Sequence, residues 1–426
     1  MLIYTVRSGD TLASVARKFG VPIQSVIADN QIAHPNRLVA GQLLVIARKE
    51  ARHTVRPGDT LHEIAGKFGV TIADILGRNP GINNPDAIYP GQIIIIPPGL
   101  VRRRDIEVNG YCYTFINPST LSLTLPYLTY TSVFSYEFTA EGGLLPPGGG
   151  EVASAAKNGG VAPLLVLTNI DETGHFSSDH ASRLLRSEEA QRRLLAELAV
   201  EMRGKGYYGI DIDLEYVRGE DRELYNMFLE RAVRFLRPLG YMISSAVAAK
   251  SSDSAAGDLY EGQDYAFHGK ILDMVLLMTY DWGHRSGEPM AVSPIYKIKE
   301  TLDYAVSVIP REKILMGMPN YGYDWILPHE PGTLAKTIML NDALSLAAEH
   351  WSEIKYDERS EAPFFNYIDE AGRSRVVWFD DPRSIDKKLA LIGDYDIRGA
   401  GYWNINNFYN PNWLVLTSMY NVKKII

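Results

Sequence analysis

Residues 206–216 read Gly-Tyr-Tyr-Gly-Ile-Asp-Ile-Asp-Leu-Glu-Tyr, with an acid at every second position from 211 to 215. Side chains alternate between the two faces of a β-strand, so Asp211, Asp213 and Glu215 share one face at steps of about 7 Å. The aliphatic residues between them share the other face. On the strand of a closed parallel barrel, the aliphatic side chains would pack on surrounding helices and the acids would point inward. Glu215, the last acid, would then lie at the C-terminal mouth, where barrel active sites sit.

The three acids also predict a chemistry. Carboxylates packed together cannot all ionise cheaply, so one proton is shared and at least one pKa rises. A glutamate with a raised pKa is suited to general acid catalysis at neutral pH. Two alternatives remain open: a half-exposed strand with its acids in water, and an oxygen-ligand site for a divalent metal. No histidine stands at an obvious spacing to join such a metal site.

The chain around this stretch alternates apolar, β-branched runs with helical stretches, which predicts an α/β fold. About 325 residues follow the N-terminal region, a length that suits one (β/α)8 TIM barrel over residues 105–426. Residues 325–380 are long for one connection and are expected to carry extra strands. The predicted barrel strands are residues 111–116, 132–138, 164–167, 209–214, 243–248, 274–279, 314–318 and 401–403.

The first hundred residues contain an internal repeat with a spacing of 49 to 50. Residues 5–12, Thr-Val-Arg-Ser-Gly-Asp-Thr-Leu, recur as Thr-Val-Arg-Pro-Gly-Asp-Thr-Leu at 54–61, and Asn30 recurs as Asn79. In each unit a threonine can cap a first helix and Phe-Gly can end it. A second helix and a final strand follow, so each unit is predicted to be βααβ without a disulfide.

The two units resemble LysM domains, over residues 2–47 and 52–98. The resemblance implies binding of N-acetylglucosamine-containing glycans such as peptidoglycan and chitin; a spacer that binds nothing is the alternative. Residues 97–104, which include Pro-Pro-Gly and Arg-Arg-Arg, are interpreted as a linker. We therefore expect the barrel to fold without residues 1–100.

The acidic strand resembles the DGxDxDxE signature of glycoside hydrolase family 18. Three further stretches match that family in order: Met-Thr-Tyr-Asp at 278–281, Gly-Met-Pro-Asn-Tyr-Gly at 317–322 and Gly-Ala-Gly-Tyr-Trp at 399–403. The chain departs from the family at Tyr208, where the outermost aspartate is replaced. It also lacks the third-strand SxGG motif, since residues 164–169 read Leu-Leu-Val-Leu-Thr-Asn. The subsite that SxGG helps to build is therefore in doubt.

The family resemblance implies a retaining, substrate-assisted hydrolysis. Glu215 would protonate the glycosidic oxygen and then act as base toward water, while the 2-acetamido oxygen of the substrate attacks the anomeric carbon. Asp213 would orient the acetamido group, Asp211 would share a proton with it, and Tyr280 would donate a hydrogen bond. The resemblance assigns substrate binding to Asp281, Met278, Trp403 and Tyr321.

Composition excludes several other classes. The hydrophobic share of 46% and the charged share of 22% are those of a globular protein, and no apolar run reaches a membrane span. The net charge of −8 argues against nucleic-acid binding. Cys112 is the single cysteine, so it forms no internal disulfide, and we expect a buried, inert thiol. We expect no metal and no cofactor.

The whole chain, two LysM-like units before a family 18-like barrel, resembles the spore cortex-lytic N-acetylglucosaminidases of endospore-forming bacteria. The resemblance implies binding of peptidoglycan, cortex fragments or N-acetylglucosamine oligomers in the spore cortex or coat. We expect a monomer, although the sequence does not reveal the oligomeric state. The N-terminus lacks a basic region followed by an apolar one, so we expect no signal peptide. A chitinase or endo-β-N-acetylglucosaminidase and a non-catalytic glycan-binding protein are the alternatives. The sequence leaves endo or exo action and the neighbouring sugar open.

Overall fold

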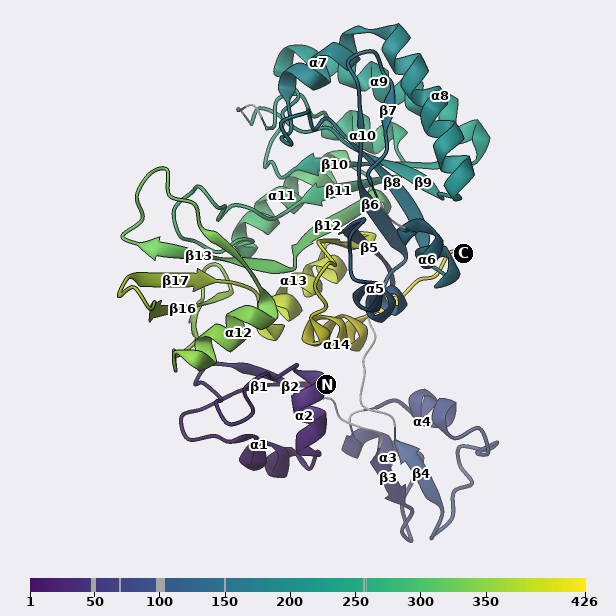
Figure 1. The fold of residues 1–426 in the computed structure, drawn as a ribbon. Helices are drawn as coiled ribbons and strands as arrows, with labels where there is room; N and C mark the ends of the chain where they lie inside the picture. The colour runs from purple at the N-terminus through teal and green to yellow at the C-terminus, as the bar shows by residue number, and fades with distance from the viewer. Residues whose placement is uncertain (47–50, 69, 97–103, 149–150, 256, 258) are drawn as a thin grey trace.

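The structure, a computed structural model, describes residues 1–46, 51–68, 70–96, 104–148, 151–255, 257 and 259–426. The predicted linker core at 97–103, the predicted module ends at 47 and 98, and the predicted helix stop at Gly69 lie outside these residues. Figure 1 shows two small N-terminal units, here called module 1 (residues 1–46) and module 2 (residues 51–96), below a larger α/β body.

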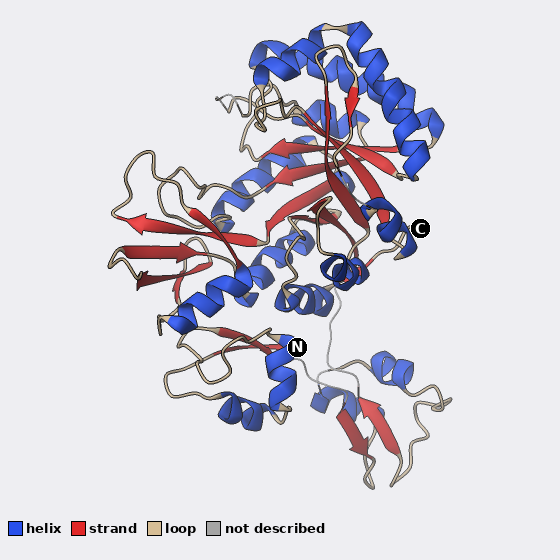
Figure 2. Cartoon of the chain, viewed as in Figure 1, coloured by secondary structure: helices blue, strands red, loops and turns tan. Residues whose placement is uncertain are grey.

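The larger body is the predicted barrel. Eight parallel strands follow the order β5-β18-β12-β11-β10-β9-β8-β6, and pairing of β5 with β6 closes the sheet. Figure 2 shows these strands in red with helices in blue around them. The prediction of an α/β (β/α)8 fold is confirmed. The barrel strands are β5 Asp105–Tyr113, β6 Tyr130–Phe138, β8 Ala162–Thr168, β9 Gly209–Asp213, β10 Met242–Ala248, β11 Met274–Met278, β12 Ile314–Pro319 and β18 Gly399–Trp403.

Each of the eight predicted strands differs from the observed strand at one end or at both; the first differs most, and the difference in the fourth concerns Glu215. The first strand begins at Asp105, six residues before the predicted start, because the buried Glu107 is paired with Arg398 and Lys423 from the far end of the chain. Strand β9 ends at Asp213, so Glu215 follows the strand and does not form part of it.

Helices surround the barrel and bury its outward-facing side chains. Ser177 and Ser187 cap α7 and α8 by accepting hydrogen bonds from backbone N–H groups in the first turn. Ile210 and Ile212 of β9 are fully buried in the cluster between strands and helices, as predicted. The helices are α5 Pro118–Thr124, α6 Val152–Asn158, α7 Ser178–Arg186, α8 Glu188–Lys205, α9 Arg222–Leu236, α10 Tyr265–Ile271, α11 Ile295–Val308, α13 Pro382–Asp394 and α14 Asn410–Met419.

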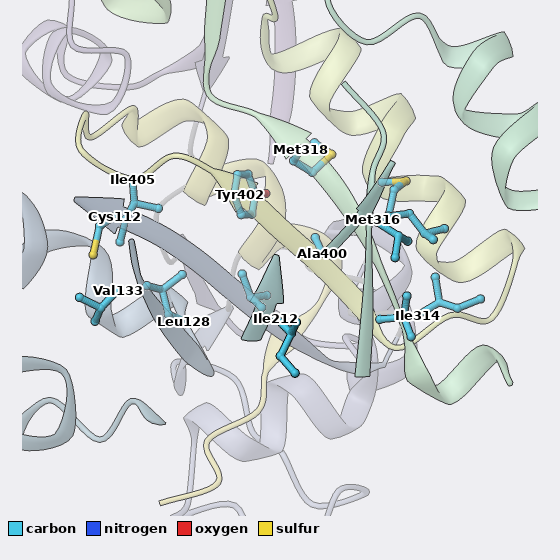
Figure 3. Close-up of a cluster of buried hydrophobic side chains, with 14 of the residues drawn as sticks. Cys112, Leu128, Val133, Ile212, Ile314, Met316, Met318, Ala400, Tyr402 and Ile405 are labelled. Atoms are coloured by element: carbon cyan, nitrogen blue, oxygen red, sulfur yellow. The ribbon is translucent and has the colours of Figure 1, made fainter. Parts of the chain in front are cut away.

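Cys112 lies in the same cluster, near Ile405 and Val133 (Figure 3). Burial raises the pKa of its thiol to about 12, so the thiolate is scarce at neutral pH. The prediction of a buried thiol is confirmed.

The long segment after β12 forms a second sheet, as predicted. Its antiparallel strands follow the order β14-β13-β17-β16-β15, and helix α12 (Leu340–Glu349) lies between β14 and β15 in the chain. The strands are β13 Tyr321–Leu327, β14 Lys336–Met339, β15 Lys355–Asp357, β16 Ala362–Ile368 and β17 Ser374–Trp378.

Both modules have the predicted βααβ order. The repeated asparagine joins helix to strand: Asn30 Nδ2 donates to Val26 O and Val45 O, and Asn30 Oδ1 accepts from Val45 N. Asn79 makes the same three bonds in module 2. The elements are β1 Leu2–Thr5, α1 Leu12–Phe19, α2 Ile23–Asp29 and β2 Leu43–Ile46, then β3 Ala51–Thr54, α3 Leu61–Phe68, α4 Ile72–Arg78 and β4 Ile93–Ile96.

Module 1 is docked on the barrel, which the sequence did not predict. Val39 and Val45 belong to the hydrophobic cluster of the barrel, and β2 packs on α13 and α14. Gln31 Nε2 donates to Phe408 O, and Gln31 Oε1 accepts from Asn410 N. These contacts make module 1 part of the same packed body as the barrel.

Module 2 has a hydrophobic core of its own, which contains no barrel residue. Tyr89 occupies the repeat position of Val39, yet Tyr89 is 65% exposed while Val39 is 4% exposed. The face that module 1 buries is therefore open in module 2.

Candidate active site

A cavity of about 500 Å³ lies at the C-terminal ends of the barrel strands. It is the size of a small-ligand pocket, and its walls are largely aromatic. The lining residues are Tyr111, Phe134, Phe176, Asp213, Glu215, Tyr216, Ala246, Ala248, Ala249, Leu259, Tyr260, Leu276, Met278, Tyr280, Asp281, Trp282, His284 and Trp403.

Asp211 is buried beneath the cavity. Its Oδ2 accepts a hydrogen bond from Tyr111 Oη at 2.7 Å, and its Oδ1 accepts one from Ser244 Oγ at 2.5 Å. Both oxygens of Asp211 are thus held by hydroxyl groups. Burial raises the pKa of Asp211 in spite of these hydrogen bonds.

Asp213 and Glu215 both reach the cavity. Asp213 Oδ1 is buried and has no hydrogen-bond partner among the described residues, so it can accept a hydrogen bond from a ligand. Burial, then the charges of Glu215 and Asp211, raise the pKa of Asp213 well above its ordinary value. Burial and then the charge of Asp281 raise the pKa of Glu215 to about 7. A carboxyl with this pKa can both give and take a proton near neutral pH.

The main chain of Glu215 is held by Asn169, the residue after β8. Asn169 Oδ1 accepts from Glu215 N at 2.9 Å, and Asn169 Nδ2 donates to Glu215 O at 2.8 Å. Tyr216 follows with a φ of 55°, in the left-handed region that non-glycine residues rarely adopt. Such backbone conformations cluster at functional sites.

Tyr280 and Asp281 follow β11, which is separated from β9 by β10 alone, and both line the cavity. Burial and then the charges of four carboxyl groups, Asp213 first, raise the pKa of Tyr280, which keeps its hydroxyl a donor. Gly317 makes room for this ring, since a Cβ there would lie 2.8 Å from Tyr280 Cε1. Asp281 Oδ1 accepts from Tyr321 Oη at 2.6 Å and from Tyr323 Oη at 3.1 Å.

Trp403 ends β18 and forms part of an aromatic cluster at the cavity. Its ring lies 4.8 Å from Phe134 in an edge-to-face arrangement and 5.8 Å from Tyr111. A fixed aromatic face of this kind packs well on the apolar face of a sugar ring.

The structure brings together six of the eight predicted site residues on the cavity wall. Asp211 lies behind the wall, and Tyr321 does not line the cavity but holds Asp281 from behind. Five residues at the site were not among the predicted ones: Tyr111, Phe134, Phe176, Asn169 and Tyr216. Of these five residues, only Tyr216 could have been predicted from its local sequence, because it directly follows the acidic stretch.

Among the residues that the structure describes, no group of three or more His, Cys, Asp or Glu residues is placed to hold a metal ion. Within the same residues, no helix is both long and apolar enough to cross a membrane.

The sequence of this chain is similar to those of known families and proteins. The sequence profile described as "Glycosyl hydrolases family 18" matches residues 166–407, and that of the LysM domain matches residues 4–47 and 53–97. A cortical fragment-lytic enzyme of Bacillus subtilis (strain 168) is 39% identical over 431 residues, covering 100% of this chain and 99% of the relative.

Solved structures agree with the sequence matches. The crystal structure of the spore cortex-lytic enzyme SleL of Bacillus megaterium QM B1551 gives a TM-score of 0.87 at 37% identity, with 100% of this chain and 99% of that chain covered. A chitinase from Chromobacterium violaceum ATCC 12472 gives a TM-score of 0.69 at 26% identity, covering 74% of this chain and 98% of that chain.

Proposed function

The chain belongs to glycosyl hydrolase family 18, and from this premise we propose that it cleaves the β-glycosidic bond of N-acetylglucosamine in spore cortex peptidoglycan. One observation carries the proposal: Glu215, with a pKa raised to about 7, lies beside the unpartnered buried oxygen of Asp213 in the cavity. The two LysM domains and the relatives named cortex-lytic support the choice of glycan.

The first step breaks the glycosidic bond. Glu215 donates its proton to the glycosidic oxygen, which leaves with the bonding electron pair. The 2-acetamido oxygen of the same sugar attacks the anomeric carbon and forms a cyclic oxazolinium ion. The nucleophile belongs to the substrate, which is the exception to the scheme of two enzyme carboxylates.

The second step returns the enzyme to its starting state. Glu215, now a carboxylate, takes a proton from water as the water oxygen attacks the anomeric carbon and reopens the ring. Two displacements at one carbon retain its configuration. The same carboxyl acts as acid and then as base, which a pKa near 7 allows.

The neighbouring groups hold the acetamido group. Asp213 Oδ1 accepts its N–H and stabilises the positive charge of the oxazolinium ion, while Tyr280 donates to its oxygen. Asp211, fixed by two hydroxyls, shares a proton with Asp213 above it. Trp403 supplies the floor for the sugar, and Tyr321 acts through Asp281.

The residues of the proposed mechanism all come from one chain, and we propose a monomer. We place the enzyme in the spore, in the cortex or coat, because the named relatives act on cortex. Mass spectrometry of products from purified cortex and from chitin oligomers separates this function from that of a chitinase, which would prefer the chitin oligomers.

The central test is Glu215→Gln, which keeps the shape of the side chain and removes its proton. We expect kcat on cortex fragments to fall by about 10²–10⁴-fold while glycan binding remains. Glu330→Gln changes an exposed glutamate outside the cavity and serves as the matched control. A Glu215→Gln enzyme within a few-fold of the parent rate would overturn the assignment.

A second test addresses the nucleophile. A substrate with hydroxyl in place of the 2-acetamido group should turn over very poorly, and a thiazoline analogue of the oxazolinium ion should inhibit. Mass spectrometry that trapped a covalent sugar on an Asp or Glu of the cavity would instead indicate an enzyme nucleophile.

A further inference from the structure

Asn169 is a fully buried residue at the end of β8, next to the cavity. Its amide group bonds both the N–H and the C=O of Glu215, at 2.9 and 2.8 Å. The Nδ2 atom also donates to Ser177 O at 2.9 Å, and the main-chain oxygen of Asn169 accepts from Ser177 N at 3.0 Å. Asn169 therefore joins the end of β8, the loop that leads to α7, and Glu215.

The hydrogen bonds of Asn169 hold Glu215 beyond the point where the pairing of β8 with β9 ends. The pairing of β8 with β9 ends at Thr168 and Asp213, so Glu215 has left the ladder of backbone hydrogen bonds. The next residue, Tyr216, turns away with a φ of 55°. The amide of Asn169 presents one acceptor and two donors, which imitates a further peptide unit of the neighbouring strand.

We propose that Asn169 is a positioning residue for proton transfer, which fixes the main chain of Glu215 so that its carboxyl group stays aimed at the glycosidic oxygen. The inference rests on the proposed role of Glu215. A misplacement of about 1 Å can reduce a rate by about 10²-fold, so one side chain in this place can control catalysis without touching the substrate.

The bond to Ser177 extends this role to the cavity wall. Phe176 lines the cavity, and Ser177 both caps α7 and is held by Asn169. Asn169 thus anchors both Glu215 and the segment that carries the wall residue Phe176. This anchor stands where the sequence lacks the SxGG motif of the family, at the end of the third barrel strand.

The test compares two leaving groups. A sugar leaving group needs a proton from Glu215, whereas a nitrophenolate leaves without one. Asn169→Ala should therefore lower kcat/KM, which reports the bond-breaking step, by about 10²-fold on N-acetylglucosamine oligomers. It should lower kcat/KM on the 4-nitrophenyl glycoside of the same sugar by less than about tenfold.

Thr168→Val is the matched control. Thr168 is equally buried and adjacent on β8, but its hydroxyl bonds Tyr136 O and not Glu215. In Thr168→Val, the ratio of the rate on N-acetylglucosamine oligomers to the rate on the 4-nitrophenyl glycoside should equal that of the parent.

Asn169→Asp is the second variant, which keeps the size of the side chain and the acceptor for Glu215 N. Its added carboxylate should raise the pKa of Glu215, so the basic limb of the pH profile of kcat/KM should move to higher pH. This readout requires only that Asn169→Asp folds, as judged by its near-ultraviolet circular dichroism.

The outcomes separate the two proposals. Suppose that the loss of activity in Glu215→Gln differs between the two leaving groups, while Asn169→Ala loses activity equally on both substrates. Asn169 then only supports folding, and the inference is overturned. If Asn169→Asp also leaves the pH profile unmoved, the same conclusion holds. If Glu215→Gln itself shows no dependence on the leaving group, the proposed role of Glu215 fails first.

Discussion

Glu215 combines two properties that oppose each other at the scale of a single residue. Catalysis needs its pKa near 7, and the means of raising it are enclosure by protein and the nearby charge of Asp281. The same two effects make the ionised form unfavourable in the folded protein. A glutamate in the unfolded chain ionises at a pKa of about 4.3, so the folded state binds this proton more tightly.

The first prediction concerns stability. Because the folded pKa of Glu215 lies above the unfolded one, stability from this group is full below about pH 4.3 and falls as pH rises toward 7. Glu215→Gln removes the ionisation and should be more stable than the parent at pH 8, by at most about 4 kcal/mol. At pH 4 the two proteins should unfold alike. Denaturant unfolding at both pH values checks this, and an equal difference at both would contradict it.

The second prediction concerns the pH dependence of activity. Glu215 must carry its proton to act as acid, so kcat/KM should fall as pH rises through about 7. Asp281→Asn removes the charge that helps to raise the pKa of Glu215, so the basic limb should move to lower pH. Tyr323→Phe removes a hydrogen bond to Asp281 but keeps the charge of Asp281. The basic limb of its pH profile should therefore match that of the parent. A basic limb unmoved in Asp281→Asn would show that its charge does not act on Glu215.

At the scale of elements, the loop before β2 fixes module 1 to the second sheet. Ile354 N donates to Ala40 O at 2.9 Å, just before β15. A Cβ on Gly41 would lie 1.8 Å from Ile354 O, so the contact requires glycine. Gly91 is its repeat partner in module 2, and a Cβ there would meet nothing within 4 Å. The two glycines have φ values of 84° and 88°, so they carry the same backbone demand.

This pair gives the third prediction. Gly41→Ala and Gly91→Ala both place a side chain at positive φ, which costs about 1 kcal/mol in either module. Only Gly41→Ala should also separate module 1 from the barrel, because it drives a methyl group into a carbonyl. Hydrogen exchange at Ile354 N should become faster in Gly41→Ala and stay unchanged in Gly91→Ala. Equal exchange in the two variants would mean that the interface yields without opening.

What the sequence could predict at this scale follows from how local each signal is. The eight barrel strands and the repeat were found because their patterns of apolar residues and turns lie within short windows. The start of β5 was missed because the charge of Glu107 becomes acceptable only through Arg398 and Lys423. Asn169 and Tyr321 act through partners more than 35 residues away, Glu215 and Asp281, which no local pattern records.

At the scale of the whole molecule, two modules of one repeat have different surroundings. Module 1 contributes Val39 and Val45 to the barrel cluster. Across the interface, the side chain of Gln31 donates to Phe408 O and accepts from Asn410 N. Module 2 leaves the corresponding face open, with Tyr89 exposed. Similar sequences therefore serve as a fixed part of the body in one case and as an independent unit in the other.

The last prediction separates these two roles by deletion. Removing residues 51–98 should leave the free energy of unfolding of the barrel and its activity on soluble fragments near those of the full chain, since the core of module 2 contains no barrel residue. Removing residues 1–50 should destabilise the barrel, because each buried aliphatic side chain lost from the shared cluster is worth about 1.5–3 kcal/mol. Loss of module 2 should still weaken sedimentation with insoluble peptidoglycan, because a linked binding unit raises the local concentration of the barrel at the wall. Thermal unfolding, soluble-fragment hydrolysis and sedimentation of both deletion variants make the comparison. If deleting residues 1–50 leaves the unfolding temperature unchanged while deleting 51–98 lowers it, the assignment of the two modules must be reversed.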